Sequence, residues 1–113
     1  MTLEILDSTL RDGAQGEDVS FSISDKLAIV RILSSLGISI IEAGNPASNP
    51  KDAEFFQEAK KLSLGACRLA AFGSTRRKHI RAEEDPGLAA LLSAGTEVLC
   101  IFGKASALHV EHV

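Results

Sequence analysis

The sequence predicts an α/β fold, the N-terminal half of a (β/α)8 TIM barrel with about four parallel strands and three helices. Four short apolar runs end at Gly or polar residues and have the length of strands: Leu3 to Leu6, Ile38 to Ile41, Leu69 to Phe72 and Val98 to Phe102. Amphipathic segments separate them, and this alternation produces a parallel sheet with right-handed crossovers. The repeat is roughly thirty residues, and eight such units give the usual size of a barrel, about 250 residues.

Each of the three predicted helices has a polar cap before it and a Gly after it. The second and third caps are followed directly by Pro, which suits the first helical position because its missing N–H has no partner there anyway. The caps and the glycines are Ser24 and Gly37 for the first helix, Asn49 and Gly65 for the second, and Asp85 and Gly95 for the third.

A complete flavodoxin-like domain is the competing architecture, but it would finish with a helix that covers the last strand. The sequence stops soon after the fourth apolar run, at His109 to Val113. We therefore expect residues 1–113 to be the N-terminal part of one TIM-barrel catalytic domain, cut before its fourth helix. The remainder of the barrel and any regulatory domain would then be absent.

Composition excludes several classes of function. With 45% hydrophobic and 24% charged residues the chain is of the soluble globular type, and its net charge of -3 gives no general attraction to nucleic acid or anionic membranes. The first ten residues contain an acid and no base, unlike a secretory signal, so a cytoplasmic location is expected. Cys67 and Cys100 stand alone in apolar runs and are interpreted as buried small hydrophobic residues rather than a disulfide or zinc site.

The densest polar run is DSTLRDGAQGED, residues 7 to 18, directly after the first predicted strand. Active sites of α/β folds lie in such positions. A turn requires Gly, but this run also supplies several groups with chemistry: Asp7, Arg11, Asp12 and Gln15. A carboxylate can bind a hard divalent cation, and a neighbouring Arg can hold a carboxylate or stabilise an oxyanion. The alternative is a solvated loop with a weak Asp-Arg ion pair.

DSTLRDGAQ resembles the D-x-T-L-R-D-G-x-Q signature of the metal-dependent barrel family that contains isopropylmalate, homocitrate and citramalate synthases and hydroxymethylglutaryl-CoA lyase. The resemblance covers essentially the whole chain. The segments EAGNP, AFGSTRRK, AEEDPGLAALLSAGTEV and CIFGK are similar to the citramalate synthase branch of that family.

This resemblance implies an acyltransferase that condenses acetyl-CoA, its co-substrate, with pyruvate to give citramalate and CoA in isoleucine biosynthesis. It also implies a divalent metal ion (Mg²⁺, Mn²⁺ or Zn²⁺). A homodimer or larger assembly is expected because a sheet cut from a barrel leaves edges and apolar surface exposed, and no nucleic-acid or membrane partner is expected. Isopropylmalate synthesis and lyase-type carbon-carbon cleavage are alternatives within the family. A non-catalytic half barrel that binds or assembles is the alternative of another class. The isolated 113 residues are expected to be inactive.

By matching positions, the resemblance makes Asp12 the metal-binding carboxylate. Arg11 would hold the oxo acid and stabilise developing enolate or alkoxide charge, and Gln15 would support this pair. Glu42, at the end of the second predicted strand, matches an E-x-G element of the family and is either catalytic or a carboxylate that orients Arg11 or caps a turn. Asn45 is expected to shape the following loop.

Phe72 and Phe102, near the ends of two strands, are candidates to line a pocket for the methyl group of pyruvate, and core packing is the alternative for both. His109 is a candidate substrate-binding residue because it matches a family histidine in the loop after strand four. The family tends to have GKSWDLHV there, whereas this chain has GKASALHV. The HVEH pair is not expected to bind metal, because the family's imidazole ligands come from an HxH element that this chain lacks.

A basic cluster, Ser74 to His79 together with Arg81, follows the third predicted strand. It could meet the phosphates of CoA or a substrate carboxylate, since basic groups at the mouth of a site attract anions. A solvated loop is the alternative. Nucleic acid is disfavoured because the chain is acidic and has neither Trp nor Tyr for stacking.

Overall fold

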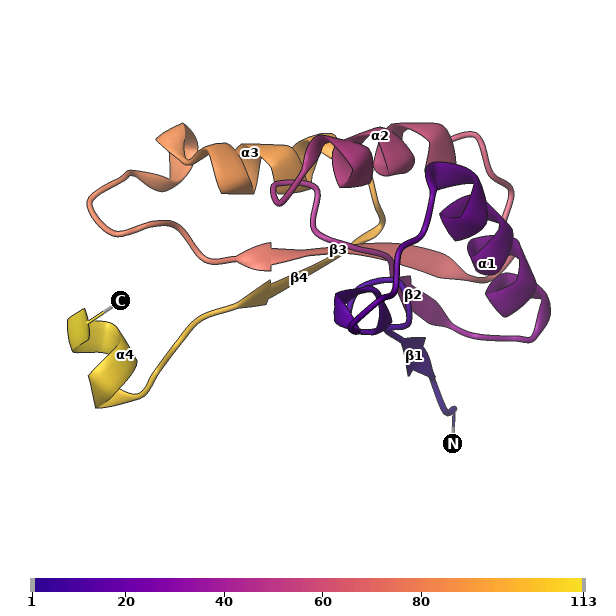
Figure 1. The fold of residues 1–113 in the computed structure, drawn as a ribbon, viewed down its shortest axis with the longest axis horizontal. Helices are drawn as coiled ribbons and strands as arrows, with labels where there is room; N and C mark the ends of the chain where they lie inside the picture. Colours follow the sequence, from indigo (N-terminus) through magenta and orange to yellow (C-terminus); the bar gives the residue numbers. More distant parts are fainter. Residues whose placement is uncertain (1, 113) are drawn as a thin grey trace.

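A computed structural model describes residues 2–112, except for the side chain of His112, and its strands and helices alternate along the chain (Figure 1). The strands are β1 (Leu6–Asp7), β2 (Ile40–Glu42), β3 (Arg68–Ser74) and β4 (Val98–Phe102). The helices are α1 (Ile23–Ser35), α2 (Pro50–Ala59), α3 (Pro86–Ser93) and α4 (Ala107–His112), and two short 3-10 turns are η1 (Gly13–Gln15) and η2 (Ala82–Glu84).

The four strands form one parallel sheet in the order β1-β2-β3-β4. Neighbours in the sheet are therefore neighbours in the chain, as in successive units of a (β/α)8 barrel. The predicted fold class, the N-terminal half of such a barrel, is confirmed. The strand boundaries differ from the sequence prediction by a few residues, mostly because β1 is shorter and β3 is longer than its apolar run.

The core lies between one face of the sheet and the helices α1 to α3. Buried side chains of the helices, including Val30, Phe55 and Leu91, pack against the sheet residues Ile41 and Leu69. Apolar side chains stay exposed on the outer strands: Leu3, Ile5 and Leu6 near β1, and Leu99, Ile101 and Phe102 on β4. Within the described residues, no helix is both long enough and apolar enough to cross a membrane.

Local capping explains where the helices begin. The cap of α1 is Ser22, so the prediction of Ser24 was wrong. The side chain of Ser22 accepts a hydrogen bond from the Asp25 N–H at 3.0 Å, and Asp25 Oδ2 accepts one from the Ser22 N–H at 3.0 Å. This reciprocal pair requires an acid three residues after the cap, and Ser24 has Leu27 there.

The predicted caps of the other two long helices, Asn49 and Asp85, are confirmed. Gly37 follows α1 with φ of 87°, a conformation that favours Gly. The α2 helix ends at Ala59, well before Gly65. A fourth helix, α4, was not predicted.

The short helix α4 begins one residue after Ser106. The Oγ of Ser106 accepts a hydrogen bond from the His109 N–H at 3.3 Å, as a helix-capping side chain does. The expectation that the chain stops before any fourth helix was therefore wrong. The local signal for the helix is Ser106, which stands at the Trp position of the GKSWDLHV pattern.

Asp85 is buried, with 2% of its surface exposed, and its carboxylate holds the start of α3 to the preceding loop. It accepts hydrogen bonds from the backbone N–H groups of Arg77 (2.6 Å), Gly87 (2.7 Å) and Leu88 (3.2 Å). The bond from the Arg77 N–H is the main cause of a lowered pKa of this carboxyl, and burial opposes it.

The pKa of Asp85 in the folded state is below its ordinary value of 3.8, so the ionised carboxylate stabilises the fold at pH values above 3.8. This stabilisation is lost as the pH falls through the folded-state pKa. We expect Asp85→Asn to lower the free energy of unfolding at neutral pH and to flatten its decline below about pH 4. Urea denaturation over a pH series measures both effects. Asp85→Ser keeps a capping oxygen without charge and should have the same shallow pH dependence, and identical slopes in wild type and both variants would contradict this role.

Candidate functional site

The loop between β1 and α1 is held by local hydrogen bonds. Asp7 accepts bonds from the N–H (2.9 Å) and the hydroxyl (3.0 Å) of Thr9. The carbonyl of Ser8 accepts bonds from the N–H groups of Arg11 (3.1 Å) and Asp12 (2.8 Å). Asp7 therefore shapes the loop, and the tight turn places Arg11 and Asp12 beyond the end of β1.

Arg11 is surrounded on three sides. Its Nε pairs with Oε1 of Glu42, its Nη1 lies 2.6 Å from Oδ1 of Asp12, and its guanidinium carbon lies 4.2 Å from the centre of the Phe72 ring. The exposed fraction of the side chain is 57% for Asp12, 23% for Arg11 and 6% for Glu42, so Glu42 is the most deeply buried of the three. These contacts fit the interpretation in which Glu42 orients Arg11, and a catalytic role for Glu42 stays a prediction.

Two partners of Arg11, Glu42 and Phe72, lie on the face of the sheet away from the helices. Side chains alternate between the two faces of a strand, so Glu42 and Phe72 lie opposite the core residues Ile41 and Ala71. Cys100 pairs with Phe72 in the register of β3 and β4 and shares that face. In a closed barrel this face is the interior, and its C-terminal end holds the active site.

Both cysteines are free, as expected. Cys67 is buried, and burial raises the pKa of its thiol. Cys100 is only half-buried, so the expectation of a buried hydrophobic residue was wrong for it. Burial is the main cause of a raised pKa of the Cys100 thiol, and a hydrogen bond and the negative charge of Glu42 add to it, whereas the charge of Arg11 opposes it.

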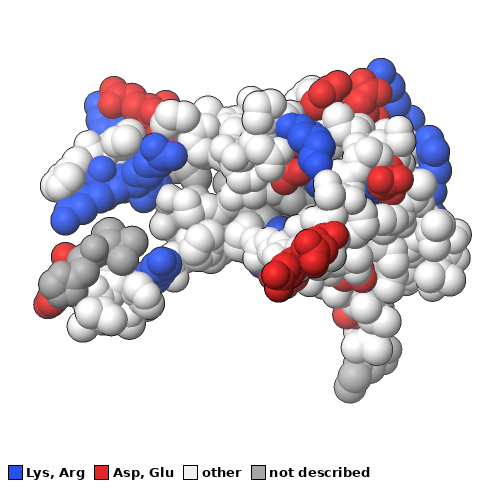
Figure 2. Space-filling model, viewed as in Figure 1, with Lys and Arg blue, Asp and Glu red and all other residues white. Residues whose placement is uncertain are grey.

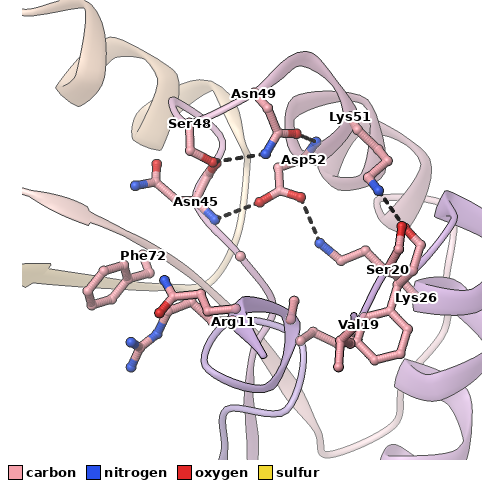
Figure 3. A pocket seen from close by; sticks show the side chains of 15 residues that line it. Arg11, Val19, Ser20, Lys26, Asn45, Ser48, Asn49, Lys51, Asp52 and Phe72 are labelled. Atoms are coloured by element: carbon pink, nitrogen blue, oxygen red, sulfur yellow. Dashed lines mark hydrogen bonds and ion pairs between the residues drawn. The ribbon is translucent and has the colours of Figure 1, made fainter. Parts of the chain in front are cut away.

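A cavity of about 260 Å³ lies beside Arg11, between the loops that follow β1 and β2 (Figure 3). Arg11, Gln15 and Phe72 line one part of it, and Lys26 and Asp52 line another. Within residues 2–112 no hydrogen bond joins the side chain of Gln15 to Arg11 or Asp12. The predicted support of that pair by Gln15 therefore stays a prediction.

The far wall of this cavity depends on a buried ion pair that the sequence did not reveal. Lys26, with 3% of its surface exposed, places Nζ 2.9 Å from Oδ1 of Asp52, and Oδ2 of Asp52 accepts a bond from the Asn45 N–H at 3.1 Å. Gly44 has φ of 140°, and a Cβ there would lie 2.7 Å from Oδ2 of Asp52. The available signal was the position of Lys26 four residues before the buried Val30 on the apolar side of α1.

The two aromatic candidates contact each other. The rings of Phe72 and Phe102 are stacked, with centroids 5.2 Å apart and planes inclined by 6°. Phe102 is 42% exposed, so core packing does not account for it. His109 lies in a second cleft, which Phe102 also borders, and its Nδ1 is 2.6 Å from the hydroxyl of Ser106. Substrate binding by these residues stays a prediction.

Asp12 offers an exposed carboxylate, whose Oδ1 faces Arg11 and whose Oδ2 accepts a bond from the Ser8 hydroxyl at 3.1 Å. Oxygen ligands of this kind suit hard divalent cations. Within the part of the chain that the structure describes, no group of three or more His, Cys, Asp or Glu residues is arranged to hold a metal ion. Asp12 can therefore supply one ligand of a metal site, but residues 2–112 do not form a complete one.

Comparison with known proteins agrees with the geometry. A family model described as HMGL-like matches residues 2–113, and the chain belongs to this family. The (R)-citramalate synthase of Sulfolobus acidocaldarius is 50% identical over 112 residues, which cover 99% of this chain and 21% of that protein. The (R)-citramalate synthase of Aquifex aeolicus is 52% identical over 106 residues, covering 94% of this chain and 20% of that protein.

A more distant relative, the 2-isopropylmalate synthase of Shouchella clausii, is 34% identical over 110 residues, which cover 97% of this chain and 20% of that protein. The chain thus spans about a fifth of the length of the curated relatives that it matches.

We expect Asp52→Ala to lower the free energy of unfolding by about 3–5 kcal/mol, because it leaves the buried ammonium of Lys26 without its counter-charge. Urea denaturation measures the change. The matched control is Glu58→Ala, which breaks the exposed Lys61–Glu58 pair and should cost less than about 1 kcal/mol. The double variant Lys26→Met/Asp52→Leu should recover much of the loss. Equal, small effects of the two single variants would show that the Lys26–Asp52 pair does not stabilise the fold.

Proposed function

We propose that the chain supplies the N-terminal part of the active site of an acyltransferase that condenses acetyl-CoA with pyruvate to give citramalate and CoA. One structural observation carries the proposal: the guanidinium of Arg11 is fixed by Glu42 and Asp12 at the C-terminal edge of the sheet. The names of the two relatives with 50% and 52% identity support this reaction over others of the family.

The reaction begins with removal of a proton from the methyl group of acetyl-CoA. The resulting enolate carbon forms a bond to the ketone carbon of pyruvate, and the ketone oxygen receives the electron pair as an alkoxide, which then takes a proton. Water subsequently cleaves the thioester, breaking the carbon-sulfur bond and releasing CoA. Negative charge thus develops on an oxygen that had none in the ground state, and a fixed cation near that oxygen lowers the barrier.

Arg11 is suited to this task because its position is set before substrate arrives. Glu42 occupies Nε and Asp12 contacts Nη1, so the guanidinium cannot rotate freely, and its remaining N–H donors are available for the oxo acid. The Phe72 ring excludes water from one face of the Arg11 guanidinium. An arginine of fixed orientation stabilises charge without reorganising during the reaction.

Asp12 is proposed as one ligand of a divalent metal ion, with the other ligands supplied from outside residues 2–112. When bound, such an ion would polarise the ketone of pyruvate as a Lewis acid. Asp12, whose carboxylate also contacts Arg11, would then supply one oxygen ligand to that ion. Gln15 is proposed to contribute from the rim of the same cavity.

The small cavity beside Arg11 favours a small oxo acid. Its volume of about 260 Å³ lies near the lower end of ligand sites. Phe72, which lines it, would contact the methyl group of pyruvate, and the neighbouring Phe102 would limit longer side chains. The relative named 2-isopropylmalate synthase makes a bulkier oxo acid the second candidate substrate.

The apolar side chains exposed on the outer strands, such as Ile5 and Ile101, support burial by further chain or by another subunit. We propose a homodimer or larger assembly located in the cytoplasm.

In the full-length protein, Arg11→Lys should lower kcat for citramalate formation by about 100-fold or more, because an ammonium keeps the charge but not the two-sided contact with Glu42 and Asp12. The midpoint of urea denaturation should change little, since Glu42 keeps a cationic partner. Arg68→Lys is the control, because Arg68 pairs with the exposed Glu4 at the other end of the sheet and should leave kcat unchanged. A fully active Arg11→Lys enzyme would remove Arg11 from the mechanism.

Substrate preference separates the two candidate reactions. We expect kcat/KM for pyruvate to exceed that for 2-oxoisovalerate by at least about tenfold, since the larger acid must displace the Phe72 ring, which lines the cavity and stacks on Phe102. CoA release with each oxo acid provides the measurement. A preference for 2-oxoisovalerate would assign the protein to isopropylmalate synthesis instead, and no CoA release with either acid would contradict the proposed chemistry.

A further inference from the structure

A basic groove of about 750 Å³ opens beyond the C-terminal ends of β3 and β4. This basic groove is the cleft whose lining includes Thr75, Arg76, Arg77, Lys78, Lys104 and His109. Figure 2 shows Lys and Arg side chains gathered on the segment that follows β3, beside a hollow that separates this segment from the region of α4. The groove is about three times as large as the cavity beside Arg11, so it accommodates a larger ligand.

Among the residues that the structure describes, the cations of the basic groove have no acidic partners. Arg76, Arg77, Lys78 and Lys104 are all exposed, and within residues 2–112 none of them forms an ion pair with a carboxylate. Nearby, Arg81 pairs with Glu83 at 3.4 Å. Like charges around one cleft repel each other and raise the local concentration of anions, so this arrangement favours a ligand with several negative charges.

The loop that carries these cations has a defined shape. The Arg77 N–H donates to the buried carboxylate of Asp85 at 2.6 Å, and Nη1 of Arg76 donates to the carbonyl of Ile80 at 3.1 Å. The side chains of Arg77 and Lys78 are left to face the groove. A preformed wall of this kind reduces the entropy that ligand binding costs.

The basic groove is continuous with the site around Arg11. Phe102 lines the groove and stacks on Phe72, and Phe72 in turn contacts the guanidinium of Arg11. All three residues lie at the same edge of the sheet, because the strands are parallel. A single extended molecule could therefore place its reacting group near Arg11 and an anionic end in the groove, with the aromatic pair between them.

We propose that the basic groove binds the pyrophosphate and 3′-phosphate groups of coenzyme A, an inference that rests on the proposed acetyl-CoA substrate. Phosphates accept charge-assisted hydrogen bonds from Lys and Arg, and coenzyme A carries its phosphates at the end distant from the thioester. Pyruvate has one carboxylate and fits the smaller cavity. Nucleic acid does not fit, because the chain has a net charge of -3 and contains neither Trp nor Tyr.

The test uses the full-length protein and the double variant Lys78→Gln/Lys104→Gln. Lys78 follows β3 and Lys104 follows β4, so two separate segments bring them to the groove. No hydrogen bond or ion pair holds either side chain in the described part of the chain, so folding should be unaffected. Isothermal titration with CoA should show affinity reduced about tenfold or more, whereas affinity for pantetheine, which lacks the phosphates, should not change. Lys78→Arg/Lys104→Arg should retain CoA affinity.

The matched control is Arg31→Gln/Lys61→Gln, which removes the same charge from two exposed positions outside the groove and should leave CoA affinity unchanged. Equal CoA affinity in wild type and Lys78→Gln/Lys104→Gln would overturn the inference, as would an equal loss in the control. Because binding is read without turnover, a protein that binds CoA through the groove but forms no citramalate would contradict the proposed reaction and still support the phosphate site.

Discussion

The ion pair between Arg11 and Glu42 is the interaction on which the site depends. It joins the loop after β1 to the end of β2, and it lies on the face of the sheet that the helices leave open. Glu42 is almost completely buried, and a buried carboxylate without a cation would be costly. The same contact that satisfies Glu42 therefore sets the direction of the Arg11 guanidinium, and through it the position of Asp12.

A second buried pair, Lys26–Asp52, supports the opposite wall of the small cavity. It connects α1 and α2, and Asp52 also holds the backbone of Asn45, so the loop after β2 is tied to two helices. Gly44 is needed there because a side chain would collide with Asp52. The fold thus places buried charge pairs beside apolar contacts where its core approaches the site.

The two hollows at this edge of the sheet differ in the way that the two proposed substrates differ. The cavity beside Arg11 is small and is lined largely by polar residues, whereas the groove beyond Phe102 is larger and bears several cations that pair with no carboxylate of residues 2–112. The stacked rings of Phe72 and Phe102 lie between them. Under the proposed function, one edge of the sheet would recognise a small oxo acid and a long polyanionic thioester by charge and size.

Local signals by themselves determined the order of strands and helices, the caps Asn49 and Asp85, and the concentration of polar groups around Arg11, because these depend on residues only a few positions apart. Only the tertiary structure decided that Glu42, 31 residues from Arg11, holds its guanidinium, and that Lys26 pairs with Asp52. Such contacts depend on the register of the strands and on how the helices pack, and neither can be read from neighbouring residues.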